Sequence, residues 1–158
     1  MRVNAPEKTH LMQANEITAP ASGWVKEITT ENHVTRIVIF LPVHVDHNQY
    51  APLEGRLTDL QYFKGTFHLA GLVKKTEKNE RQELTFATQL GIVRVVQIAG
   101  VIARTITASV RVGEHVHPKQ IIGHIAFGSR VDLYLPESVT LSVKKGQRVH
   151  ARAVIGNW

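Results

Sequence analysis

Short runs in which apolar and polar residues alternate recur along the chain from Glu16 onward, and turn-forming residues separate them. These runs lie at 24–28, 35–40, 65–70, 83–86, 93–98, 131–135 and 139–143. Because successive side chains of a strand point to opposite faces, a period of two is typical of strands with one buried face. Apolar residues spaced as on a helix do not recur over a useful length. The pattern therefore predicts an all-β protein.

Two short segments of the sequence occur twice. The segment 19–23 (APASG) resembles 51–55 (APLEG), and 112–116 (VGEHV) resembles 145–149 (KGQRV). The glycine of each segment precedes strand-like residues, as expected where a tight turn leads into a hairpin. The repeats predict a duplicated sheet in a barrel-sandwich-like β fold.

Domains that carry biotin or lipoate share this architecture and bear the cofactor on a lysine at an exposed hairpin tip. Lys144 and Lys145 precede Gly146, where such a tip could form. Neither lysine lies in a Met-Lys-Met or Asp-Lys-Ala triplet. We therefore favour a basic turn facing water over a carrier site.

A chain of 158 residues, 43% of them hydrophobic, can bury one substantial core, so we predict one domain at 16–158 behind a loose arm at 1–15. The absence of cysteine excludes disulfides, thiolate nucleophiles and cysteine-ligated zinc. No apolar run reaches the roughly 18 residues of a membrane-spanning helix. The polar segment 1–15 does not resemble a secretory signal. We therefore expect a soluble, cytoplasmic protein.

The net charge of +6 implies attraction to an acidic partner, such as an anionic membrane surface, an acidic metabolite or a nucleic acid. The basic residues are scattered along the sequence, and aromatic residues make up only 6% of it. Stacking platforms for single-stranded nucleic acid need aromatic side chains. We therefore rank a nucleic-acid-binding β-barrel below the other classes and predict no nucleic-acid partner.

Two apolar runs meet at Gly128-Ser129 in the stretch 126–136. Beyond this dipeptide, Val131, Leu133 and Leu135 alternate with polar residues, as in a half-buried strand. By themselves these residues predict only a bend or bulge before an edge strand.

Five segments, in the same order and with matching spacing, resemble the short-form phosphatidylserine decarboxylase proenzymes. Residues 127–136 (FGSRVDLYLP) resemble the processing site of that family. The other four are 96–104 (its VAG-x-x-AR strand), 79–81 (NER), 51–55 (AP-V-x-G) and 62–67 (Y-x-PG-x-F). The resemblance extends from about residue 16 to the end of the chain.

The resemblance implies a proenzyme that cuts itself between Gly128 and Ser129. The Ser129 hydroxyl attacks the preceding carbonyl carbon, and elimination from the resulting ester leaves a pyruvoyl group at Ser129, which is the cofactor. The products are a β chain, 1–128, and an α chain, 129–158. Gly128 suits the attacked carbonyl because glycine permits close approach and unusual backbone angles. The implied reaction converts phosphatidylserine, or a related serine phospholipid, to the ethanolamine form.

Activation of the serine needs a base, and the resemblance assigns this role to His47, which matches the histidine of the family's D-V-H motif. His124, five residues before Ser129, could also approach the site. His44, Asp46 and His47 do not predict a metal site, because strand positions alternate between faces and no further ligand is near in sequence. The other histidines near turns are expected on the surface: His115, His117 and His150.

The chain departs from the family at two aspartates. Ser22 stands at the aspartate of the family's SPADG motif, and Val45 stands at the aspartate of D-V-H. Asp46 is adjacent to Val45, but on a strand it points to the opposite face. Because an aspartate orients the histidine and stabilises its imidazolium, its loss is expected to slow self-cleavage. The alternative to an active enzyme is thus a processing-deficient relative that binds amine-bearing lipids or a partner protein.

Longer relatives carry a hydrophobic segment and an FFRDP-like stretch ahead of the first motif, and residues 1–15 contain neither. We therefore expect docking to a phospholipid surface to depend on surface charge and a few apolar loop residues, as a transient peripheral contact. A soluble amino-acid-like substrate is the alternative to a lipid. Assembly into a homo-oligomer is compatible with the sequence.

Overall fold

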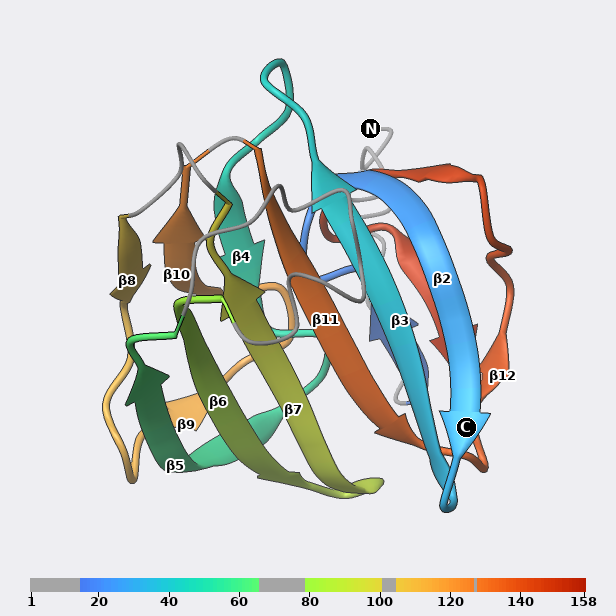
Figure 1. The fold of residues 1–158 in the computed structure, drawn as a ribbon. Coiled ribbons are helices and arrows are strands. Elements are labelled where there is room, and N and C mark those ends of the chain that lie inside the picture. Colours follow the sequence, from blue (N-terminus) through green and yellow to red (C-terminus); the bar gives the residue numbers. More distant parts are fainter. Residues whose placement is uncertain (1–14, 66–78, 101–104, 127) are drawn as a thin grey trace, which may run out of the picture.

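Figure 1 shows the fold of the computed structural model, which describes residues 15–65, 79–100, 105–126 and 128–158. Strands account for all its regular structure, and the all-β prediction is confirmed. Within the described ranges, no helix is long and apolar enough to cross a membrane. The strands are β1 (Glu16–Thr18), β2 (Gly23–Glu31), β3 (Val34–Leu41), β4 (Asn48–Tyr50), β5 (Gly55–Phe63), β6 (Arg81–Thr88), β7 (Gly91–Ile98), β8 (Ile106–Ala108), β9 (His115–Val116), β10 (Ile121–Ile125), β11 (Ser129–Pro136), β12 (Thr140–Leu141), β13 (Arg148–Val149) and β14 (Val154–Asn157).

Most of the predicted runs lie within strands. The runs at 24–28, 35–40, 83–86, 93–98 and 131–135 fall in β2, β3, β6, β7 and β11. The run at 139–143 forms only the short strand β12, and the run at 65–70 lies almost wholly outside the described residues.

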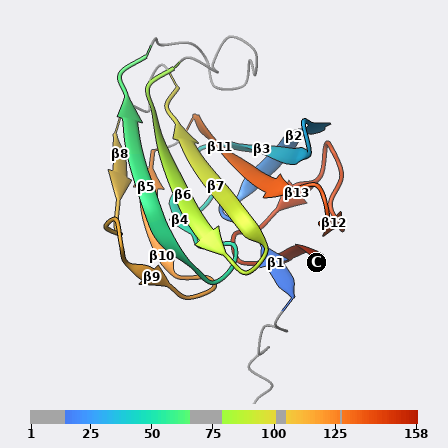
Figure 2. The ribbon, with the colours of Figure 1, turned by 90° about the horizontal axis from the view of Figure 1, so that it is seen from below.

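One large antiparallel sheet dominates the fold, with the strand order β13-β2-β3-β11-β7-β6-β5-β9. This sheet curls into a half-barrel (Figure 2). Two smaller sheets, β1-β14-β12 and β4-β10-β8, contribute to the same core. Ile17 and Ile155 from one small sheet and Ile122 from the other join a buried cluster with Val95 and Leu133 of the large sheet. A single core of this kind is what holds the three sheets together as one domain.

The large sheet is symmetric about the contact between β11 and β7. Going outward, β11, β3, β2 and β13 on one side are matched by β7, β6, β5 and β9 on the other. Val25 N donates to Gln147 O at 2.8 Å, and Leu57 N donates to Glu114 O at 2.9 Å. The pairing register shifts directly after both Val25 and Leu57. The two sides of the sheet are therefore copies of one arrangement.

The turns of the two halves are copies as well. Gly113 and Gly146, the glycines of one predicted repeat, have φ angles of 94° and 90°. Lys119 and Arg152 follow in equivalent turns and have φ angles of 67° and 71°. The duplicated sheet predicted from the repeats is confirmed.

One half of the duplicated fold is inserted into the other. The half formed by β4 to β10 is continuous in sequence, from residue 48 to residue 125. The other half combines residues 16–41 with residues 129–158. The chain therefore crosses between the halves twice, through 42–47 and through 126–128.

Strand β11 lies at the centre of the large sheet, between β3 and β7, and not at an edge. Val131, Leu133 and Leu135 are buried in the core, as their alternation predicts. On the other face, Arg130 and Asp132 form an ion pair at 2.8 Å, and each side chain is only 1% exposed. The interpretation of a half-buried edge strand is thus wrong. The strand is central, and its second face can be buried because the charges of Arg130 and Asp132 neutralise each other.

Candidate active site

The two crossovers between the halves lie side by side. Two hydrogen bonds join the ends of the crossovers. Where the first crossover begins, Leu41 O accepts from Gly128 N at 2.9 Å, and where it ends, His47 O accepts from Ile125 N at 3.1 Å. Phe127 lies outside the described residues. The fold therefore brings His47 and the Gly128-Ser129 bond onto neighbouring connections, although they are far apart in sequence.

Ser129 is the first residue of β11 and is fully buried. Its hydroxyl donates to Ala126 O at 2.5 Å. Gly128 has a φ of 74°, in the left-handed region that favours glycine. A Cβ added at Gly128 would meet no atom within 4 Å. Glycine is therefore required here by the backbone conformation and not by lack of space.

His47 is partly buried and directly precedes β4. Its Nε2 lies 3.3 Å from Pro42 O. A carbonyl oxygen can only accept, so this contact requires the ring proton on Nε2 and leaves Nδ1 as the acceptor of a neutral imidazole. Nδ1 is therefore the atom through which His47 can take up a proton.

His124 lies beside His47. The two rings meet edge to face, with 6.3 Å between their centroids. His124 Nδ1 lies 3.2 Å from Asn48 Oδ1, and these two residues are paired in the β4–β10 sheet. His124, considered for the site from its position in the sequence, thus lies beside the proposed base His47.

Asp46 stabilises the first crossover. Its Oδ1 accepts from Asn48 N at 2.9 Å, and its Oδ2 accepts a short hydrogen bond from the Tyr50 hydroxyl. Burial, followed by the hydrogen bond to Asp46, raises the pKa of Tyr50 above its ordinary value. The Tyr50 hydroxyl therefore keeps its proton and remains a donor at neutral pH.

The two positions where the family has an aspartate are occupied by neutral, partnered side chains. Ser22 is 7% exposed, and its Oγ accepts from Ala151 N at 2.8 Å. Val45 packs against the hydrophobic core. A carboxylate is thus absent at both positions, as the sequence already shows.

Three buried glutamines form a chain of hydrogen bonds that ends at the backbone of His47. Gln82 Nε2 donates to Gln97 Oε1 at 3.1 Å, and Gln97 Nε2 donates to Gln49 Oε1 at 2.8 Å. Gln49 Nε2 then donates to His47 O at 2.9 Å. Through Gln49 of β4, these hydrogen bonds link the large sheet to the backbone of His47.

The sequence contained a signal for this glutamine chain that our sequence reasoning missed. Gln97 follows Val93 and Val95 at the core-facing positions of β7, where an amide needs a partner. Gly123 is the complementary signal, because an added Cβ there would lie 2.5 Å from the Gln97 Nε2.

We predict that Gln97→Leu destabilises the protein by about 2 kcal/mol or more, because it leaves the buried amides of Gln49 and Gln82 without their partner. Urea unfolding followed by circular dichroism measures this change. Gln61→Leu, on the exposed part of β5, is the matched control and is expected to change stability by less than about 0.5 kcal/mol. Equal stability of the two variants would contradict the role of the chain.

Two segments that carry the family resemblance contact each other. Asn79 is buried, and its Nδ2 donates to Ala99 O at 2.8 Å. Ala99 N donates in turn to Glu80 O at 2.9 Å. The NER triplet is thus joined to the end of the VAG strand.

The remaining candidates occupy ordinary surface positions. Lys144 N donates to the Gln147 Oε1 in an exposed turn, as expected for a solvated basic turn. The described ranges contain no group of three histidine, cysteine, aspartate or glutamate side chains that could hold a metal ion. The following histidines are exposed: His44, His115, His117 and His150.

The chain matches the family model described as phosphatidylserine decarboxylase over residues 2–157. A phosphatidylserine decarboxylase proenzyme of Burkholderia ambifaria (strain MC40-6) is 38% identical over 138 residues, which are 83% of this chain and 64% of the relative. One from Burkholderia mallei (strain SAVP1) is 37% identical over 139 residues, 84% of this chain and 64% of the relative. The chain thus spans 64% of the length of these relatives. No solved structure matches it significantly.

The family match covers residues 2–157, which is nearly the whole chain. The chain therefore belongs to the phosphatidylserine decarboxylase family.

Proposed function

We propose that this chain is a proenzyme that cuts itself between Gly128 and Ser129 and then acts as a pyruvoyl-dependent decarboxylase of phosphatidylserine or a related serine phospholipid. The relatives named as phosphatidylserine decarboxylase proenzymes suggest this activity. The observation that carries the proposal is the position of the Gly128-Ser129 bond on one crossover, directly beside the crossover that ends in His47.

Self-cleavage uses groups of the chain alone. The Ser129 hydroxyl turns from Ala126 O and gives its proton to His47 Nδ1, and its oxygen attacks the Gly128 carbonyl carbon. The peptide C–N bond breaks as the ester forms, and the Ser129 nitrogen takes up the proton held by His47. A proton then leaves the Ser129 Cα while the bond between the Ser129 Cβ and the ester oxygen breaks, which frees the Gly128 carboxylate and leaves dehydroalanine. Addition of water releases ammonia and leaves the keto group of the pyruvoyl.

The position of Ser129 fits an uncharged keto group. Ser129 is fully buried at the start of β11, where a charged group would be costly. Once formed, the pyruvoyl group supplies a ketone that takes up the electron pair left by departing carbon dioxide. β11 pairs with β3 and β7 along its length, so the new end at residue 129 stays in place after cleavage.

An exposed apolar residue and the net charge of the chain support contact with an anionic lipid surface. Val43, on the first crossover, is 66% exposed. The net charge of the chain is +6, and each Lys or Arg near an anionic surface contributes about 1 kcal/mol of attraction. Val43 and the basic side chains together support a transient peripheral contact, while a soluble amino-acid-like substrate remains the alternative.

One observation favours a second candidate, a processing-deficient relative that binds amine-bearing lipids or a partner. The Ser129 hydroxyl is engaged by Ala126 O, and Ser22 and Val45 leave both aspartate positions without a carboxylate. An uncleaved chain would keep the fold and lack the keto group.

The intact mass of the purified protein separates these candidates. The active proenzyme yields two fragments, with a keto group in place of the amino terminus at residue 129, and releases carbon dioxide from phosphatidylserine vesicles. Release from free serine but not from vesicles would select the soluble substrate. A stable 17.7 kDa species after long incubation would select the processing-deficient relative.

A further inference from the structure

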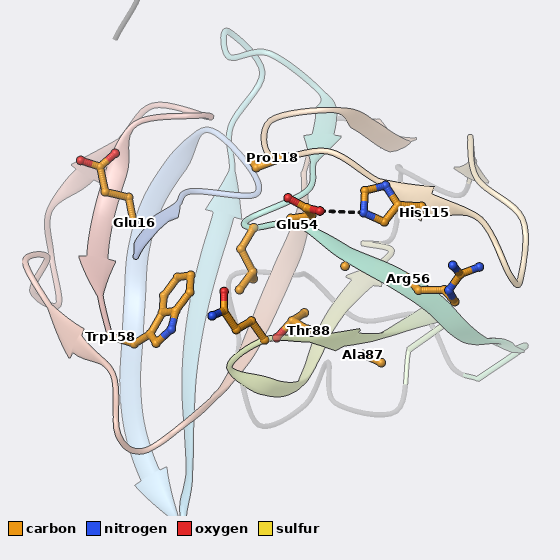
Figure 3. A pocket seen from close by; sticks show the side chains of 11 residues that line it. Glu16, Glu54, Arg56, Ala87, Thr88, His115, Pro118 and Trp158 are labelled. Carbon is orange, nitrogen blue, oxygen red and sulfur yellow. Dashed lines mark hydrogen bonds and ion pairs between the residues drawn. The ribbon is translucent and has the colours of Figure 1, made fainter. Parts of the chain in front are cut away.

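A hollow of about 410 Å³ lies between the inserted half and the two ends of the other half, at Glu16 and Trp158. It is bounded by the turn before β5, the end of β6, the residues after β9 and the end of the chain. Figure 3 shows Glu54 and His115 joined on one side of it and the Trp158 indole on another. The hollow thus combines a carboxylate with an aromatic wall.

The internal symmetry relates this hollow to the candidate active site. Trp158 N donates to Asn15 O at 3.2 Å, as Ile125 N donates to His47 O at 3.1 Å. Asn15 therefore occupies the place that corresponds to His47. Because Trp158 lines the hollow, the hollow lies at the position that the internal symmetry relates to the surroundings of His47.

The residues proposed for self-cleavage are replaced at the symmetry-related positions. Thr88 pairs with Gly91 in the same way that Leu41 pairs with Ser129, so a glycine takes the place of the serine nucleophile. With glycine and asparagine in place of serine and histidine, the second site has no means of cleaving the chain.

The charges in the hollow select a cation. The repeat APASG/APLEG puts Glu54 at the place of Ser22. Glu54 Oε1 is hydrogen-bonded to His115 Nε2 at 2.9 Å, and in the described part of the chain its Oε2 has no partner. Glu16 adds a second carboxylate to the lining, and the guanidinium of Arg56 donates one of its N–H groups to Gly113 O at 2.6 Å. The lining therefore carries two carboxylates against one guanidinium, and the open Oε2 of Glu54 can accept from an ammonium group.

Part of the lining is apolar. Trp158 presents its ring (Figure 3), and Leu53, Ala87 and Pro118 also line the hollow. An indole face attracts a cation as well as an alkyl chain. We propose that this hollow is a second, non-catalytic binding site, which takes a small molecule with a primary ammonium group held by Glu54 and an apolar body packed against Trp158. The inference rests on the duplicated fold and does not require the proposed decarboxylation.

Tryptophan fluorescence of the full chain tests this site. The chain has two tryptophans, so Trp24→Phe leaves Trp158 as the only reporter. Titration with n-hexylamine is expected to change this fluorescence saturably, with a Kd in the millimolar range that suits a ligand of so few atoms. Hexanol and hexanoate, which keep the alkyl chain and lack the ammonium group, are expected to bind at least tenfold more weakly.

Glu54→Gln in the Trp24→Phe background is expected to weaken hexylamine binding at least tenfold, because it removes the charge at an exposed position and keeps the shape. Glu31→Gln, at an exposed position outside the hollow, is the matched control and is expected to leave binding unchanged. Equal binding of hexylamine by the two variants, equal binding of hexanoate, or no saturable change would overturn the proposal. The same titration can be made with Ser129→Ala added, because that substitution prevents self-cleavage and does not change the hollow. A failure of amine binding can therefore be distinguished from a failure of self-cleavage.

Discussion

Ser129→Ala is expected to abolish both self-cleavage and decarboxylation, because the substitution removes the nucleophile and the precursor of the keto group together. The protein should nevertheless fold. The hydroxyl makes one hydrogen bond, to Ala126 O, and its loss costs about 1 kcal/mol. Since a methyl group fits wherever the serine side chain fits, the fully buried position is not overfilled. The expected product is therefore a stable, uncleaved chain.

Intact mass and release of carbon dioxide from phosphatidylserine vesicles measure the two losses separately. Ser142→Ala, at an exposed position on the loop after β12, is the matched control and should cleave and turn over like the parent chain. Fragments split before residue 129 in the Ser129→Ala protein would show that another nucleophile or a contaminating protease cuts the chain. Turnover without fragments would show that the keto group is not the cofactor.

Much of the fold could be predicted because its determinants are local. Alternation along 93–98 and 131–135 reflects the period of a strand, and the structure has β7 and β11 there. Gly113 and Gly146 appear in the repeat because equivalent turns need a residue at positive φ. The insertion of one half into the other could not be predicted in this way, since it depends on pairing between strands far apart in the chain.

The partners of buried polar side chains were harder to predict than the strands. Arg130 and Asp132 are separated by one residue, and a sequence alone does not show whether two such charges face water or each other. Gln49 and Gln97 are far apart in sequence, and only the pairing of strands from different sheets brings their amides together. The serine and the histidine were found from a family resemblance, whereas the hydrogen bonds around them come from tertiary structure.

The insertion gives the proposed cleavage site a structural meaning. Cutting at 128–129 severs one of the two crossovers and leaves the inserted half, 48–125, attached through the other. After the cut, residues 129–158 still contribute β11, which lies between β3 and β7, and β14, which lies between β1 and β12. Most hydrogen bonds of residues 129–158 therefore survive the cut, so cleavage can change the chemistry at residue 129 without dismantling the domain.

The aspartate positions lead to the second large expected effect. Ser22→Asp is expected to increase the rate of self-cleavage at least tenfold. Loss of the comparable aspartate in a serine-protease triad lowers the rate by about four orders of magnitude, and we take this factor as the upper limit of the increase. The turn that holds Ser22 rests against β4, because Tyr50 N donates to Pro20 O at 2.9 Å. A carboxylate there can accept from Ala151 N as the Ser22 Oγ does, and it is expected to stabilise the imidazolium of His47.

A double-mutant cycle with His47→Ala decides whether the gain passes through the imidazole. His47→Ala alone is expected to abolish cleavage, and the variant carrying both changes should be equally inactive, because a carboxylate without the base has no proton acceptor to orient. The rate at which fragments appear in intact-mass spectra measures all four proteins, with Ser142→Asp as the charge control. A faster Ser22→Asp chain that keeps its gain in the His47→Ala background would remove His47 from the role of base. His124, whose ring lies 6.3 Å from that of His47, would then be the side chain to replace next.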